Sequence, residues 1–128
     1  MLRFRTLVVV AALGAALSVA VAALVAVTAA SSAAPIRLNG TVGPGFTITL
    51  KRGTAPVRVL KAGMYTITVS DKASIHNFVL EGPGVERDIT TPGFTGTKTV
   101  TVRLRVGKYK FYCRPHESSM FGFFRVTA

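Results

Sequence analysis

Short segments in which apolar and polar side chains alternate are the strongest constraint on how this chain folds. A period of two is that of a β-strand with one face in a core and the other in solvent. It recurs after residue 35 at residues 46–50, 57–59, 65–69 and 100–106. Sequences typical of turns separate these segments, and no helical pattern of useful length interrupts them. The pattern predicts an all-β fold, specifically an antiparallel Greek-key β-sandwich.

Clusters that contain glycine mark the expected turns. They are Asn39-Gly40, Gly43-Pro44-Gly45, Lys51-Arg52-Gly53, Gly82-Pro83-Gly84 and Thr91-Pro92-Gly93. We expect the stretch from Gly82 to Gly96 to be one loop that covers an edge of a sheet. The pattern Leu-basic-apolar-Gly-x-Tyr begins at both Leu60 and Leu104, and it predicts the same strand-turn-strand connection twice.

The first 34 residues have the composition of an export signal. Arg3 and Arg5 precede an uncharged, mostly apolar stretch from Leu7 to Ala30, as in a signal peptide. The stretch is also long enough to span a bilayer, which takes about 20 residues. A cleaved signal and a retained anchor both stay open, and the alanine-rich composition favours cleavage. We expect residues 1–34 to direct export and residues 35–128 to form one domain outside the cytoplasm, in the periplasm, in the cell envelope or secreted.

The domain is strongly basic. Without Arg3 and Arg5, 14 basic residues face five acidic ones, a net charge of about +9. Such a charge attracts acidic partners, but the export signal and the scatter of the cations argue against nucleic acid. The densest basic group is either a solvated sheet face or a surface for an acidic redox partner, an anionic envelope polymer or the membrane. It consists of Arg103, Arg105, Lys108 and Lys110.

Metal-binding residue types are concentrated in the stretch Cys113-Arg114-Pro115-His116-Glu117-Ser118-Ser119-Met120. It holds a thiolate, an imidazole and a thioether, which are the ligand types of a copper electron-transfer site. Such a site needs a second imidazole, and the only other histidine of the chain is His76. Pro115 lacks a backbone donor and must end the strand that leads to Cys113, so a tight loop follows. The chain therefore carries a complete ligand set for one copper ion.

The same residues are also compatible with different chemistry. A lone cysteine or methionine is commonly a buried apolar side chain. The run from His116 to Met120 begins like a zinc-protease helix but lacks the second histidine. A Cys113 nucleophile with a histidine base is a weaker alternative, and so is structural zinc, for which this is a poor ligand set. A single cysteine in an exported protein has no disulfide partner, and copper would protect it.

A longer pattern surrounds these residues. It is Tyr109-x-Phe111-Tyr112-Cys113-x-Pro115-His116-x3-Met120-x-Gly122-x-Phe124-x-Val126 together with His76-Asn77-Phe78. Over most of the chain after residue 35, the sequence resembles the plastocyanin and azurin branch of the cupredoxins.

The resemblance implies a role for each site residue. His76, Cys113 and His116 match the in-plane copper ligands, and Met120 matches the weak axial one. Asn77 matches the residue that ties the two ligand-bearing segments together and braces the cysteine sulfur. The gap of three residues between His116 and Met120 departs from the short-loop members, which often place the methionine one residue earlier or later.

Site and export signal together lead to a functional hypothesis. We expect an exported blue copper protein, not an enzyme, that carries one electron by cycling Cu(II) and Cu(I), with Cys113 as the electronic path and His116 near the surface as the exit. Its partner would be a transient redox protein, with acidic proteins among the candidates, and the protein would be a monomer. Two alternatives are a copper-binding or copper-delivering envelope protein and a basic surface-binding module without metal. The apolar neighbours expected to exclude water from the site are Phe78, Phe111, Phe121 and Phe123.

Overall fold

The computed structural model describes residues 26–128, and most of the expected export signal lies outside them. Ser32–Ala128 forms a compact unit of its own. Every strand and every buried core residue of the described chain lies within this unit, so we expect it to fold on its own. Residues 26–35 have no helix or strand. In the described part of the chain, no helix is long and apolar enough to cross a membrane.

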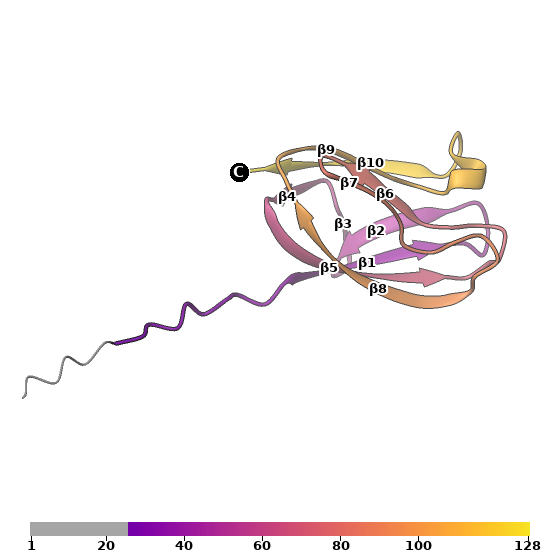
Figure 1. Ribbon diagram of the computed structural model, residues 1–128. Helices are drawn as coiled ribbons and strands as arrows, with labels where there is room; N and C mark the ends of the chain where they lie inside the picture. Colours follow the sequence, from indigo (N-terminus) through magenta and orange to yellow (C-terminus); the bar gives the residue numbers. More distant parts are fainter. Residues whose placement is uncertain (1–25) are drawn as a thin grey trace, which may run out of the picture. The chain divides into compact units, whose positions relative to one another are not determined.

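Two five-stranded sheets face each other across the core (Figure 1). The first sheet has the order β3-β2-β1-β5-β8 and the second the order β4-β10-β9-β6-β7. The strands of the first sheet are β1 (Ile36–Val42), β2 (Ile48–Arg52), β3 (Ala55–Pro56), β5 (Gly63–Asp71) and β8 (Gly96–Leu104). Those of the second sheet are β4 (Val59–Lys61), β6 (Val79–Gly82), β7 (Val85–Asp88), β9 (Gly107–Tyr112) and β10 (Phe121–Thr127).

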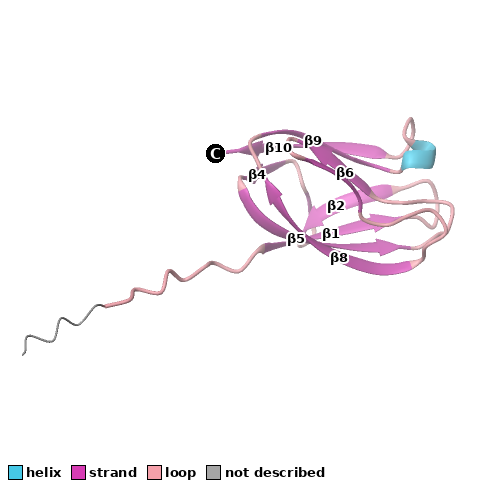
Figure 2. Ribbon diagram, viewed as in Figure 1, coloured by secondary structure: helices cyan, strands magenta, loops and turns pink. Residues whose placement is uncertain are grey.

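The all-β fold class predicted from the alternation is confirmed. Within residues 26–128 the one helix is the short 3-10 turn η1 (Arg114–His116), which is cyan in Figure 2. Most neighbouring strands are antiparallel, but each sheet also contains one parallel pair, β1 with β5 and β10 with β4. Successive side chains of a strand point to opposite faces. In β5, for example, Tyr65, Ile67 and Val69 are buried while the residues between them are partly exposed.

Two expectations about turns are wrong. Asn39-Gly40 lies inside β1, where a Cβ atom on Gly40 would stand 2.9 Å from the Phe78 ring. Glycine there allows an aromatic ring to pack closely on the strand, and no turn is formed. The stretch from Gly82 to Gly96 is not one loop, because it contains β7, which pairs with β6 as the edge of the second sheet.

Some expected strands have different ends. The strand expected at residues 46–50 begins only at Ile48 and continues to Arg52, so Phe46 lies in a loop. The segment expected at 57–59 is replaced by two short strands, β3 and β4, and the one expected at 100–106 ends at Leu104. Pairing with neighbouring strands sets these ends, and the alternation alone does not contain that information.

The repeated pattern forms the same connection twice, at β4–β5 and at β8–β9, where the chain crosses from one sheet to the other. Its glycines, Gly63 and Gly107, have φ values of 154° and 148°, a region that favours glycine. Each tyrosine hydroxyl bonds to backbone four residues earlier. Tyr65 donates to the Lys61 carbonyl (2.7 Å), and Tyr109 accepts from the Arg105 N–H (2.9 Å).

Strand β8 forms an open edge of the first sheet and pairs only with β5. On its inner face, Val100 and Val102 point toward the core, whereas Lys98 is exposed near the rim. Lys98 lies opposite the buried Val69 in register, and its Nζ atom is 5.2 Å from the centroid of the Phe94 ring. A charged side chain therefore occupies an inward-facing position of the longest edge strand among the described residues.

The strand directions gather four loops at one end of the sandwich, here called the loop end. They connect β1 to β2 (43–47), β5 to β6 (72–78), β7 to β8 (89–95) and β9 to β10 (113–120). The opposite end, here called the distal pole, holds the start of β1 and the end of β10. In Figure 1 the loop end carries the yellow 3-10 turn on the right.

Candidate metal centre

Cys113 and His116 are held on one short loop at the loop end. Cys113 directly follows β9 and is buried, and His116 is half-buried at the end of η1. The His116 N–H donates to the Cys113 carbonyl (3.1 Å), and the Met120 N–H donates to the His116 carbonyl (2.8 Å). The Cys113 N–H in turn donates to the Met120 carbonyl (3.0 Å), which closes the loop where β10 begins.

His76 reaches the same place from the loop before β6. It lies in this loop and not in the strand-like run expected from the sequence. The side chain is fully buried, and its backbone N–H donates to the Ala73 carbonyl (3.1 Å). A Cβ atom on Gly43 would stand 3.1 Å from the His76 ring, so the β1–β2 loop packs closely on the imidazole. Because β6 pairs with β9, the loops that carry His76 and Cys113 are neighbours.

The three polar side-chain atoms converge on one point. The Nδ1 atoms of His76 and His116 are 3.1 Å apart, and the Cys113 Sγ atom is 3.7 Å and 3.5 Å from them, respectively. The point equidistant from all three lies about 2.0 Å from each. In zinc sites, for comparison, the bonds are about 2.0–2.1 Å to histidine nitrogen and about 2.3 Å to thiolate sulfur. Two imidazoles and one thiolate in a trigonal arrangement are the donor set of a blue-copper site. The residues present therefore fit a copper ion.

Met120 borders the same cluster. Its side chain is almost completely buried, and its backbone forms the two hydrogen bonds that close the 113–120 loop. Its buried thioether ends the loop that carries Cys113 and His116, and Met120 stays the predicted weak fourth ligand.

Asn77 ties the two ligand-bearing loops together. Its Oδ1 atom accepts a hydrogen bond from the Arg114 N–H (2.7 Å). The sequence-based expectation of a brace to the sulfur has no counterpart among the described hydrogen bonds, since the buried Nδ2 atom has no partner there. Thr90 fixes the next residue, because its hydroxyl oxygen accepts from the Phe78 N–H (2.9 Å). Thr90 is a supporting residue that sequence reasoning missed.

Ion pairs hold the outside of the loop. Arg114 lies 2.6 Å from Asp88 on β7, and Lys110 lies 2.7 Å from Glu117. The hydrogen bond to Asp88 raises the pKa of Arg114 above its ordinary value, so the guanidinium stays charged. Burial raises the pKa of the Tyr112 phenol, so the side chain before Cys113 is neutral at physiological pH.

Phe46 is a second residue that sequence reasoning missed. Its ring meets both imidazoles edge to face, with centroids 5.3 Å from His76 and 4.8 Å from His116. The ring is 61 % exposed and separates the two histidines from part of the solvent. Phe46 directly follows the turn sequence Gly43-Pro44-Gly45, which could have indicated a loop residue. The alternation of residues 46–50 instead led us to expect Phe46 in a strand.

The expectation about water-excluding phenylalanines is right for two residues and wrong for two. Phe78 and Phe111 are buried and stack with centroids 5.8 Å apart. Phe121 and Phe123 are 46 % and 49 % exposed. They point outward because they occupy the alternate positions of β10 whose neighbour, Phe124, points into the core.

Sequence comparison agrees with this geometry. The family model of copper binding proteins of the plastocyanin/azurin family matches residues 47–127, which is more than half of the chain. The chain belongs to this family. Its cofactor is copper, one ion per chain. The family resemblance stated from the sequence is confirmed, and the alternative of a module without metal is not retained.

Solved structures of cupredoxins share the fold. Reduced rusticyanin is 22 % identical, with a TM-score of 0.53 over 75 % of this chain and 81 % of that one. Rusticyanin from Thiobacillus ferrooxidans is 19 % identical, with a TM-score of 0.51 over 75 % and 79 %. A rusticyanin variant is 20 % identical, with a TM-score of 0.55 over the same shares. No curated protein matches the sequence.

Proposed function

We propose that the protein is an exported blue copper protein that carries single electrons. His76, Cys113 and His116 would hold the ion, and Met120 would supply a weak thioether ligand. The convergence of the three ligand atoms around one point carries this proposal. Bound copper supplies the one-electron couple between Cu(II) and Cu(I).

The protein's own contribution is a fixed ligand set. Thiolate and thioether ligands suit Cu(I), and imidazoles suit Cu(II). The backbone bonds of the 113–120 loop and the Asn77–Arg114 bond hold these groups in place whichever state is bound. Buried Phe78 and Phe111 keep water from the inner side of the site, which favours a stable potential.

Electrons would leave through His116, the ligand that reaches the surface. Exposed apolar side chains lie at the same loop end, namely Ile75, Phe121 and Phe46, whose ring contacts His116. A small apolar surface suits brief contact with a redox protein. Lys72 is exposed at the same end, and an acidic partner would be attracted there.

Export is proposed from the sequence of residues 1–34. Basic residues followed by an apolar stretch support it. Sequencing the N-terminus of protein purified from producing cells would test it. A start near residues 28–35 would show cleavage, and a start at Met1 in the membrane fraction would show a retained anchor.

A Cu(II) titration of Ser32–Ala128 tests the copper site, followed by visible absorption and electron paramagnetic resonance. We expect an intense thiolate-to-copper band that saturates at about one copper per chain and is absent in Cys113→Ser. Met120→Leu is expected to keep the band and change the reduction potential, whereas Met64→Leu, at an exposed site on β5, leaves both unchanged. A weak signal that ignores Cys113 would refute the site.

Electron transfer is tested separately from copper binding. A carrier exchanges electrons quickly between its oxidised and reduced forms and keeps its copper in the presence of a chelator. Slow electron exchange together with transfer of copper to the chelator would instead identify a copper-delivery protein.

A further inference from the structure

Three cations gather on the outer face of the second sheet, near the distal pole. Arg125 lies opposite Lys108 in register, and its N–H donates to the Arg58 carbonyl (2.9 Å). Together with Phe123 and Phe124, these residues line a shallow hollow of about 260 Å³. None of the three forms an ion pair within residues 26–128. The hollow therefore presents uncompensated positive charge.

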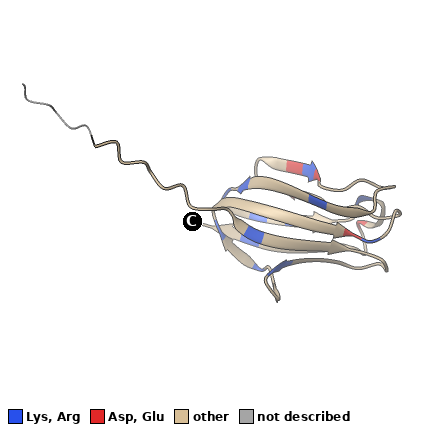
Figure 3. Ribbon diagram, turned by 90° about the horizontal axis from the view of Figure 1, so that it is seen from below, with Lys and Arg blue, Asp and Glu red and all other residues tan. Residues whose placement is uncertain are grey.

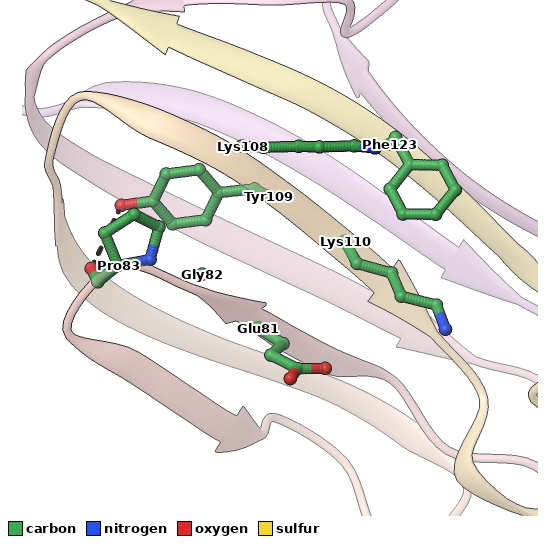
Figure 4. A pocket seen from close by; sticks show the side chains of 7 residues that line it. All are labelled: Glu81, Gly82, Pro83, Lys108, Tyr109, Lys110 and Phe123. Atoms are coloured by element: carbon green, nitrogen blue, oxygen red, sulfur yellow. Dashed lines mark hydrogen bonds between the residues drawn. The ribbon is translucent and has the colours of Figure 1, made fainter.

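Exposed apolar side chains border the same hollow. Val59 lies opposite Arg125 on β4 and is 62 % exposed, and the Phe123 ring is about half exposed. The Lys108 Nζ atom is 4.5 Å from the centroid of that ring, and Figure 4 shows the lysine side chain extended toward it. Cations interleaved with exposed apolar groups are typical of surfaces that bind anionic membranes.

Carboxylates on this sheet lie nearer the loop end. Glu81 lines the neighbouring hollow, but it pairs in register with Lys110, two positions closer to the loop end than Lys108. Asp88 and Glu117 are engaged in ion pairs at the loop end itself. Figure 3, seen from the side of the first sheet, shows that acidic positions are few along the strands in front as well.

The position of the first strand of the domain also favours a membrane as the binding partner of this hollow. β1 begins at Ile36, at the distal pole. Residues 31–35 join it to the apolar sequence from Leu7 to Ala30, and five residues reach at most about 17 Å. An anchor in that sequence would keep the distal pole, and not the loop end, close to a lipid surface.

We propose that Arg58, Lys108 and Arg125, with Val59 and Phe123, dock the domain onto an anionic phospholipid surface. Headgroup phosphates lie against the three cations, and the two apolar side chains contact the interface. Arg125 lies on β10, five residues after Met120, and five residues of a strand span about 16 Å. The ligand loop therefore stays free for a redox partner. This inference goes beyond electron carriage and does not depend on it.

Sedimentation of metal-free Ser32–Ala128 with large vesicles tests the proposal. We expect binding to phosphatidylcholine vesicles that contain about one-third phosphatidylglycerol, and no binding to phosphatidylcholine alone. The bound fraction should fall as salt rises from about 50 mM to about 300 mM, because screening weakens the attraction. Combined substitution of Arg58→Glu, Lys108→Glu and Arg125→Glu should lower the partition coefficient about tenfold or more.

A matched control separates the effect of this patch (Arg58, Lys108 and Arg125 with Val59 and Phe123) from the effect of net charge. Arg37→Glu, Lys51→Glu and Arg103→Glu together make the same change of charge on the outer face of the first sheet, and should change binding less than about threefold. Equal losses in the two triple variants, or no binding of the unaltered domain, would overturn the proposal. If the unaltered domain did not bind vesicles but bound an immobilised acidic protein, the patch would be a binding site for a protein partner. Circular dichroism checks that each variant is folded. If the triple variant is not, the milder double variant Lys108→Gln and Arg125→Gln replaces it and should lose part of the vesicle binding.

Discussion

Asn77 shows how much one buried side chain contributes to the metal centre. Its Oδ1 atom is the partner of the Arg114 N–H, across the junction of the two ligand-bearing loops. In Asn77→Ala this donor loses its partner in a partly buried place, which costs about 1–3 kcal/mol. We expect the free energy of unfolding of the metal-free domain, measured by urea titration, to fall by that amount.

The matched control is Asn39→Ala, at an exposed position of β1. Its effect should stay within about 0.5 kcal/mol. Similar values for the two variants would mean that the bond between the loops does not stabilise the fold. Copper affinity, measured by competition with a chelator, should also fall in Asn77→Ala, because the loop of Cys113 is then less firmly held.

Candidate ligands could be predicted at the residue scale because their chemistry is rare in this chain. With one cysteine and two histidines, composition left no choice among them. Phe46 and Thr90 could not be found in this way. Phenylalanine and threonine are common, and the contacts of these two exist only once the loops at residues 43–47 and 89–95 have folded against the ligands.

Gly122 makes the close packing of β10 possible. A Cβ atom at this position would overlap the Phe111 ring, which is buried and already stacked on Phe78. To make room for it, the ring would have to leave its stacked position, and overpacking of this kind costs about 1–3 kcal/mol. We expect Gly122→Ala to lower the melting temperature of the metal-free domain, measured by circular dichroism.

The control for this strand is a glycine with open space around it. A Cβ atom on Gly45 would meet nothing within 4 Å. Gly45→Ala should therefore leave the melting temperature the same or slightly higher, since alanine restricts the unfolded chain. If the two substitutions had equal effects, ring packing would not be the reason for glycine at position 122.

Strand identity could be predicted at the element scale better than strand ends. The cores of β5 and β8 were predicted from alternation, because each strand has one face in the core. The turn predicted at Gly40 was wrong because glycine is common in turns. The reason for this glycine is the ring of Phe78, which is distant in the sequence and packs on the strand only in the folded protein. β7 was missed because its exposed edge position leaves almost no buried residues to alternate.

For the whole molecule, the sequence gives the net charge but not how the charged side chains are distributed over the surface. Arg103 and Lys108 are near each other in the chain and were expected to belong to one group. Arg103 lies on the outer face of the first sheet and Lys108 on that of the second. The cross-over between them separates the charges, and the patch beside Lys108 is completed by Arg58 and Arg125 from other strands.

The open edge of β8 has a consequence for contacts between copies of the molecule. A nine-residue strand with free backbone groups on one side is a template on which a strand of a second molecule could pair. A lysine that points inward on such a strand opposes that pairing, because stacking two edges would bury its charge. Lys98 occupies this kind of position.

Lys98→Val should therefore promote self-association. The inner face of β8 would then present an unbroken apolar row with Val100 and Val102. We expect the apparent mass, measured by sedimentation velocity, to rise with concentration, while Lys51→Val on β2 remains monomeric. A monomeric Lys98→Val would show that the edge is protected in another way. If the expectation holds, a single inward lysine is what ends the sheet at one molecule and keeps it from extending into the next.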